Sequence, residues 1–195
     1  MSKQLQKYDG PVFGITNSLE LFQKLKHDSL NLRKNWHSYD AFNFLVTSWH
    51  LFYDWKNSDP RNALSREKRD KNKLPKEMNL VLDIVRDFAN GSKHFKLDEK
   101  SENKRRVDEV HVGDEAGLYE YFFHENLLAV TVDEHWYFSI RVLHNIVMSY
   151  FDWVFDDGIP VKQFPDAVKE TILYCNIANR ETGEPPEIWL LNADN

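Results

Sequence analysis

Two polar residues on an apolar stretch of the chain are the first candidates for chemistry. His50 and Asp54 lie four residues apart in the string SWHLFYDW. Residues at this spacing share one side of a helix, so the imidazole and the carboxylate can touch. Surrounding aromatics would desolvate the imidazole and make its protonation sensitive to the carboxylate. The pair is a candidate binding site, and the alternative is a hydrogen-bonded pair that orients Trp49 and Trp55 in the core.

A second polar group lies in the string RDFANGSKHF. Arg86, Asn90, Lys93 and His94 fall on one side of a helix, provided that the helix continues past Gly91. As catalytic residues, His94 would act as acid or base, and Arg86 or Lys93 would stabilise phosphate charge. The alternative is that Asn90-Gly91 caps the helix and Lys93 is a solvated residue near the negative end of its dipole.

A third polar stripe contains Arg141, His144, Asn145 and Asp152, at offsets of three, four and eleven residues. We take Arg141, His144 and Asn145 as candidate binding residues that could face the other two groups. The stripe is equally explained as the solvent-facing side of an amphipathic helix.

Metal binding is a further use for some of these residues. His50 and Asp54, four apart on a helix, could chelate one ion together with His94 and another ligand. The sequence contains no HExxH motif, no pair of ExxH motifs, no phosphate loop and no dinucleotide fingerprint. We therefore predict no metal and no cofactor, and a metal-dependent enzyme is the last of three hypotheses.

The elements that must position these residues are mostly amphipathic helices. Asn17, followed by Glu20, is typical of a capped helix start, and Pro75 is well placed to open another helix. Gly91 looks like a helix stop. The apolar periodicity predicts helices at about 18–35, 38–56, 75–90, 136–155 and 165–178.

Two segments depart from the helical period. Residues 57–76 are rich in Lys, Arg, Asn and Asp, which predicts an exposed basic loop. Three β-prone runs, at 107–112, 118–123 and 127–132, predict a three-stranded antiparallel β-meander inserted into a helical bundle. The predicted fold class is therefore mainly α, as a single domain over residues 1–195 with extended tails at 1–16 and 181–195.

Composition narrows the class of protein. The 195 residues are 42% hydrophobic and 14% aromatic, enough for one large core. A net charge of −6 argues against a protein that coats nucleic acid or membrane through its overall field. One cysteine, Cys175, excludes an intrachain disulfide and fits a reducing compartment. With no signal peptide and no apolar run of about 18 residues, we expect a cytoplasmic protein without a membrane partner.

Two resemblances accompany these motifs. The strings SYDAFNFLVTSWHLFYDW and RDFANGSKHF, over about 38–97, resemble uncharacterised bacterial helical proteins with WHxxxDW-like and ANGSKH-like segments. More loosely, a helical chain with an Arg followed by a His is similar to the HEPN superfamily, which implies RNA cleavage or RNA binding in bacterial defence and a homodimer. That family has four to six residues between Arg and His. Here Arg86 and His94 have seven between them, and Arg106 and His111 have four but lie at a strand entry.

The sequence thus leaves three functional hypotheses. The first is a nucleic-acid-directed effector of HEPN-like type, for example a bacterial defence or toxin RNase. The second is a non-catalytic helical protein-interaction module in which the polar residues form satisfied networks. The third is the metal-dependent enzyme described above.

Overall fold

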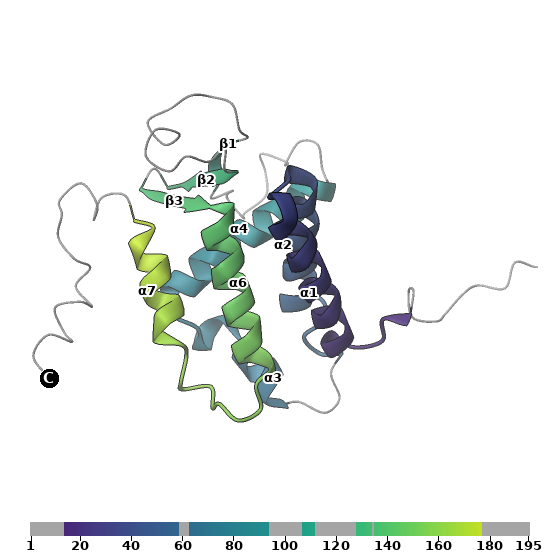
Figure 1. The fold of residues 1–195 in the computed structure, drawn as a ribbon. Helices are drawn as coiled ribbons and strands as arrows, with labels where there is room; N and C mark the ends of the chain where they lie inside the picture. The colour runs from purple at the N-terminus through teal and green to yellow at the C-terminus, as the bar shows by residue number, and fades with distance from the viewer. Residues whose placement is uncertain (1–13, 59–62, 94–106, 112–127, 134, 177–195) are drawn as a thin grey trace, which may run out of the picture.

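The computed structural model describes residues 14–58, 63–93, 107–111, 128–133 and 135–176. Within these ranges the chain is mainly helical, as predicted (Figure 1). The helices are α1 (Ser18–Asn35), α2 (Ser38–Phe52), α3 (Ala63–Lys68), α4 (Lys76–Lys93), α6 (Ile140–Phe155) and α7 (Asp166–Tyr174), with a short 3-10 turn, η2, at Lys71–Lys73.

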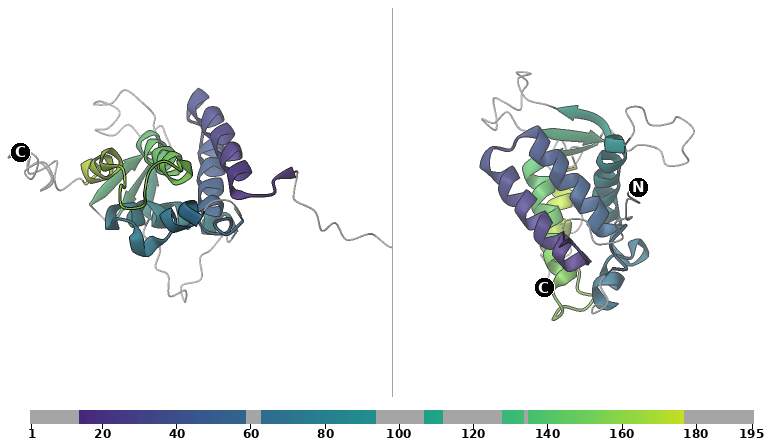
Figure 2. Two further views of the ribbon diagram at one scale, coloured as in Figure 1. Left: turned by 90° about the horizontal axis from the view of Figure 1, so that it is seen from below. Right: turned by 90° about the vertical axis from the view of Figure 1, so that its right-hand side faces the viewer.

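The helices pack around one apolar core. α1 contacts α2 and α6, α2 also contacts α4, and α7 contacts both α4 and α6. Figure 2 (right) shows α1 and α2 side by side on one face of the molecule, in front of α6 and α7. Phe44, Val81 and Val154, from three different helices, are completely buried. Burial of each such side chain stabilises the fold by about 1.5–3 kcal/mol.

The start of α1 follows from its sequence. The Asn17 side chain accepts a hydrogen bond from the backbone N–H of Glu20, as the capping pattern predicted. The Glu20 carboxylate in turn accepts from the hydroxyl and the backbone N–H of Thr16, and these hydrogen bonds lower its pKa. At the other end, Trp36 adopts a left-handed backbone with φ 54°, which turns the chain from α1 into α2.

A small antiparallel sheet lies at one end of the helices (Figure 1). It consists of β1 (Val107–His111), β2 (Ala129–Val132) and β3 (Trp136–Ser139), with β2 paired to both neighbours. The meander predicted from the three β-prone runs is not confirmed. The first and third runs contain β1 and β2, the run at 118–123 lies outside the described residues, and β3 falls where a helix was predicted to begin.

The prediction of an exposed basic loop at 57–76 is wrong for its central residues. Lys68 and Arg69 are completely buried, and the segment forms α3 and η2. The Lys68 ammonium donates to the carbonyls of Trp153 and Asp156 at the end of α6. The charged donor thus meets carbonyl groups in the last turn and at the C-cap of α6, where helix carbonyls need partners from outside the helix. Burial lowers the pKa of Lys68.

Arg69 connects three further segments. Its guanidinium donates to the carbonyls of Leu51 and Lys56, at and beyond the end of α2, and to the carbonyl and hydroxyl of Ser65 in α3. One Nη also lies 3.5 Å from the hydroxyl of Ser18, the first residue of α1. Arg69 therefore holds the ends of α1, α2 and α3 together.

Several helix boundaries differ from the predicted ones. α4 continues through Gly91 to Lys93, which decides between the stop and the continuation that the sequence left open there, although Gly is unfavourable in a helix by about 1 kcal/mol. α2 ends at Phe52, before the predicted end at Lys56. Pro75 immediately precedes α4, and Pro165 occupies the N-cap position of α7. Most of both predicted tails lies outside the described residues.

Candidate functional site

The outer face of α2 carries aromatic and apolar side chains that are exposed to solvent within the described part of the chain. Tyr39 is 76% exposed, Phe42 is 42% exposed and Tyr53 is 58% exposed. Val46 and His50 are partly exposed at intermediate positions. Since these residues are separated by three or four positions, they lie along one side of the helix. We call Tyr39, Phe42, Val46, His50 and Tyr53 the α2 stripe.

This helix lacks the charged residues of an ordinary surface helix. Within Ser38–Phe52 the single residue of fixed charge is Asp40, in the first turn. A helix at the edge of a domain normally exposes charged side chains opposite its buried face, whereas a helix that is apolar all round is covered on all sides. α1 and α4 cover two sides of α2, and the α2 stripe is the third side.

His50 and Asp54 are in contact, as the sequence predicted. The Nδ1 atom of His50 forms a hydrogen bond with the carboxylate of Asp54 at the end of α2. The two side chains are 31% and 42% exposed, so the pair lies at the surface and not in the core. A carboxylate at Nδ1 selects the tautomer whose Nε2 is an acceptor. The pair thus presents a directed acceptor within the α2 stripe.

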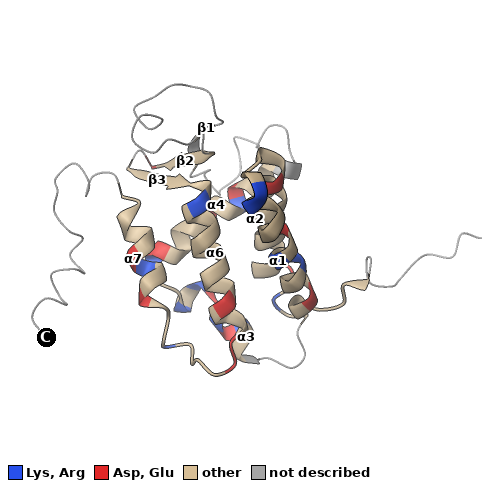
Figure 3. Cartoon of the chain, viewed as in Figure 1, with Lys and Arg blue, Asp and Glu red and all other residues tan. Residues whose placement is uncertain are grey.

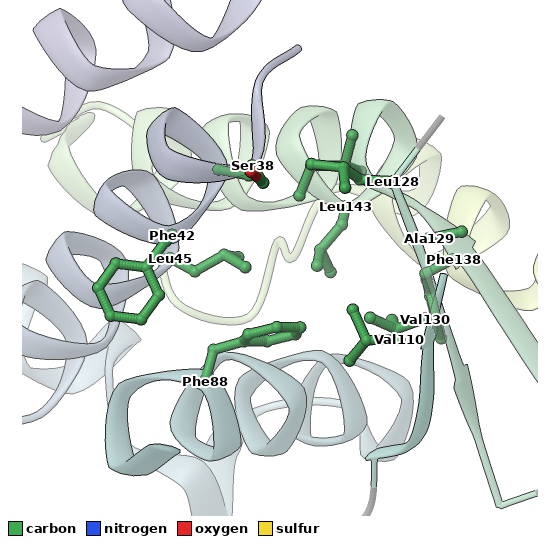
Figure 4. Close-up of a pocket in the computed structure, with 12 residues that line it drawn as sticks. Ser38, Phe42, Leu45, Phe88, Val110, Leu128, Ala129, Val130, Phe138 and Leu143 are labelled. Atoms are coloured by element: carbon green, nitrogen blue, oxygen red, sulfur yellow. The ribbon is translucent and has the colours of Figure 1, made fainter. Parts of the chain in front are cut away.

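An apolar pocket of about 120 Å³ adjoins the stripe. α2 contributes Phe42 and Leu45, α4 contributes Phe88, and α6 contributes Leu143, with the sheet on the remaining side (Figure 4). The side chains around it are apolar apart from Ser38. This space accommodates about one benzene-sized group. Because Phe42 belongs to both features, the pocket continues the α2 stripe toward the core.

Arg86 is engaged within its own helix. Its guanidinium contacts the carboxylates of Asp83 at 3.0 Å and Asp87 at 3.1 Å. The second oxygen of Asp87 accepts a hydrogen bond from the backbone N–H of Val107, the first residue of β1. Asp83 also pairs with Lys71 at 2.7 Å. Arg86 therefore neutralises the buried carboxylate that attaches β1 to α4.

His144 lies in a buried network between α1 and α6. Its Nε2 is 2.7 Å from the hydroxyl of Ser29, and its Nδ1 is 3.1 Å from the amide oxygen of Asn145. In many enzymes a hydroxyl nucleophile is activated by an imidazole, and the imidazole is oriented by an oxygen atom on its other side. Ser29, His144 and Asn145 have this order. Ser29 and His144 are only 6% and 4% exposed, however. A substrate cannot reach this hydroxyl, so the arrangement acts as a satisfied core network.

Cations surround this network. Burial lowers the pKa of His144, and the charge of Arg33 adds to that effect, while the hydrogen bond with Asn145 opposes it. The Arg141 guanidinium lies over the Trp36 ring at 5.0 Å, and the same ring meets His144 edge-on. Of the three predicted binding residues on α6, Asn145 is the exposed one.

Within the described part of the chain, each of the three predicted polar groups forms its own set of hydrogen bonds. His50 bonds to Asp54, Arg86 to Asp83 and Asp87, and His144 to Ser29 and Asn145. Asn90 is half-buried on α4. His94 and the side chain of Lys93 lie outside the described residues, so the predicted catalytic set is incomplete.

Two further findings concern metal ions and membranes. Among the described residues, no three His, Cys, Asp or Glu side chains gather as a metal site would require. In the same ranges, no helix combines the length and the apolar character needed to cross a bilayer. In the cartoon of Figure 3, the positions of Lys and Arg are spread over several helices.

Comparisons with protein-family models, with curated proteins and with solved structures find no match to this chain. The candidate site is therefore argued from its own geometry.

Sequence reasoning missed two partners of the residues that it selected, Asp83 beside Arg86 and Ser29 beside His144. Asp83 lies three residues before Arg86, a spacing that could have indicated the ion pair. Ser29 shares the buried face of α1 with Leu25 and Leu32, where a lone polar residue signals an internal hydrogen bond. The pairing of Ser29 with His144 has no local signal, because the two are 115 positions apart.

Proposed function

We propose that this chain is a non-catalytic helical interaction module that binds another protein through the α2 stripe. The observation that carries the proposal is the exposure of Tyr39, Phe42 and Tyr53 on a helix with almost no charge. Depletion of charge and enrichment in aromatic residues are the compositional marks of the buried centre of a protein interface.

The pocket beside Phe42 supports this proposal. Interface affinity is concentrated in a few aromatic or apolar side chains that fill well-packed pockets. The pocket between α2, α4 and the sheet has the size for one such side chain and offers no charged partner. A partner would therefore place an apolar group in the pocket and lay an apolar surface along the stripe.

The polar networks have the character of a stabilising scaffold and not of an active site. Arg86 is held by two carboxylates, and His144 is closed off from solvent. Groups with satisfied partners and fixed orientation position the helices that carry a binding surface.

Photo-crosslinking in cells tests the proposal. A photoreactive phenylalanine derivative replaces Tyr39 in the full chain, and irradiated samples are separated by denaturing electrophoresis. We expect an adduct of higher mass, because the side chain at position 39 would contact the partner. Tyr174 on α7 is 61% exposed and provides the matched control position. Equal adduct formation at both positions, or none at position 39, would contradict the proposal.

The nucleic-acid-directed role predicted from the sequence remains a separate proposal. It rests on Arg86, Asn90, Lys93 and His94, of which Arg86, Asn90 and Lys93 lie on α4. Its test is incubation of the purified chain with labelled RNA, compared with the His94→Ala variant. Cleavage that disappears in the variant would support it, and intact RNA in both samples would remove it.

A further inference from the structure

The α2 stripe has a symmetric order about its central residue. Tyr39 lies seven positions before Val46 and Tyr53 seven positions after it. Phe42 lies four positions before Val46 and His50 four positions after it. When two copies of a helix pack antiparallel about a two-fold axis, residues at equal distances from the centre face each other. The stripe can therefore pack against itself with each residue opposite a side chain of matching character.

The facing pairs in such an arrangement are chemically compatible. Tyr39 meets the partner's Tyr53, and Phe42 meets the partner's His50, so a ring faces a ring in both cases. Val46 meets the partner's Val46 at the axis, where its small side chain permits the close helix separation of 8–10 Å. The stripe from Tyr39 to Tyr53 then extends over about 21 Å of helix.

Charged side chains lie near both ends of the stripe, Asp40 in the first turn of α2 and Asp54 just beyond its last turn. Asp54 lies eight positions after Val46, and Ser38, the first residue of α2, lies eight positions before it. An antiparallel pair places each Asp54 carboxylate near the N-terminus of the partner's α2. That terminus carries partial positive charge from the helix dipole, which attracts Asp54, and it also carries the Asp40 carboxylate, which repels it. Since the stripe contains no Lys, Arg or Glu, no like charges meet at its centre.

We infer that the protein bound by the α2 stripe is a second copy of this chain, packed antiparallel about a two-fold axis at Val46. This inference rests on the proposed function, because it uses the same docking face. The dimer is isologous: each contact occurs twice, and each copy contributes the same surface.

Sedimentation of the purified full chain across the micromolar range measures the association. The wild-type chain is expected to sediment as a dimer. Phe42→Lys and His50→Glu are each expected to weaken the dimer at least about tenfold, because each change is made twice in the interface. The double variant F42K with H50E places Lys opposite Glu on both sides of the axis. It is expected to associate at least about tenfold more tightly than either single variant.

Leu30→Lys is the matched control, because Leu30 is an apolar residue on α1 that is 61% exposed and lies outside the stripe. Its association should equal that of the wild type, and circular dichroism checks that every variant is folded. A monomeric wild-type chain overturns the inference. So does a dimer unaffected by both single substitutions, or one that the double variant does not recover.

The two experiments together distinguish failure of this inference from failure of the proposed function. If the purified chain is monomeric and the adduct at position 39 contains a different protein, the docking face stands and the second copy is rejected. If position 39 forms no adduct, the docking face itself is rejected. Mass spectrometry of the adduct distinguishes these results, because a dimer yields peptides of this chain alone.

Discussion

Two regions of the molecule invert the usual distribution of side chains. Around α3, the charged residues Lys68 and Arg69 are completely buried. On α2, the aromatic residues Tyr39 and Tyr53 are mostly exposed. Lys and Arg are almost never fully buried without partners, and contiguous exposed aromatics are uncommon on monomeric domains.

The difference shows what each region needs from its surroundings. At α3, the cations occupy positions where the ends of α2 and α6 present carbonyl groups, so both sets of polar groups are satisfied inside the chain. At α2, nothing in the described chain covers the stripe. The buried cations are therefore part of the fold, whereas the exposed aromatics are available for binding.

The largest expected effect is the loss of the Arg69 network. Arg69→Met keeps an apolar stem but leaves the carbonyls of Leu51, Lys56 and Ser65 without their donor. Each buried unsatisfied group costs about 1–3 kcal/mol, so we expect the free energy of unfolding to fall by about 3 kcal/mol or more. Urea unfolding followed by tryptophan fluorescence measures it. Arg66→Met, at an exposed position in α3 three residues before Arg69, is the control, and an equal loss in both variants would contradict the role of Arg69.

A smaller effect is expected at His144, whose pKa is lowered by burial. Below the unfolded-state pKa of about 6.5, the unfolded chain binds a proton that the folded chain resists. The contribution of this site to stability is therefore constant above that pH and decreases as the pH falls toward the folded-state pKa. His144→Gln should remove this pH dependence and cost about 1–3 kcal/mol at pH 8.

Urea unfolding of the wild type and the variant at several pH values provides the comparison. The difference between the two curves isolates His144 from the other histidines. If the difference does not change between pH 8 and the acidic range, the buried network with Ser29 does not control protonation of this imidazole.

The smallest effect is expected on the α2 stripe. Tyr39→Gln should change the free energy of unfolding by less than about 0.5 kcal/mol when the chain is dilute, because the side chain is 76% exposed. Thermal unfolding at low and high protein concentration measures this. A loss above about 1 kcal/mol in dilute solution would mean that Tyr39 packs within its own chain, and the contrast with Arg69 would then disappear.

Short-range features could be predicted from the sequence because they depend on neighbouring residues. The cap at Asn17, the helical stretches and the contact of His50 with Asp54 follow from spacings of three or four positions. Whether the helix stops at Gly91 stayed open in the sequence, and α4 continues to Lys93 despite a local glycine penalty of about 1 kcal/mol. The first turn predicted for α6 became β3, where pairing with β2 determines the conformation.

The sequence alone determined that the chain is mainly helical, that its second helix is apolar on nearly every side, and that His50 and Asp54 share one side of it. The tertiary structure decided which polar residues are inside. It buried Lys68 and Arg69 against the ends of distant helices and joined His144 to Ser29 across 115 positions. It also decided which side of α2 remains uncovered. These outcomes depend on which elements meet in space, and a local pattern does not encode that choice.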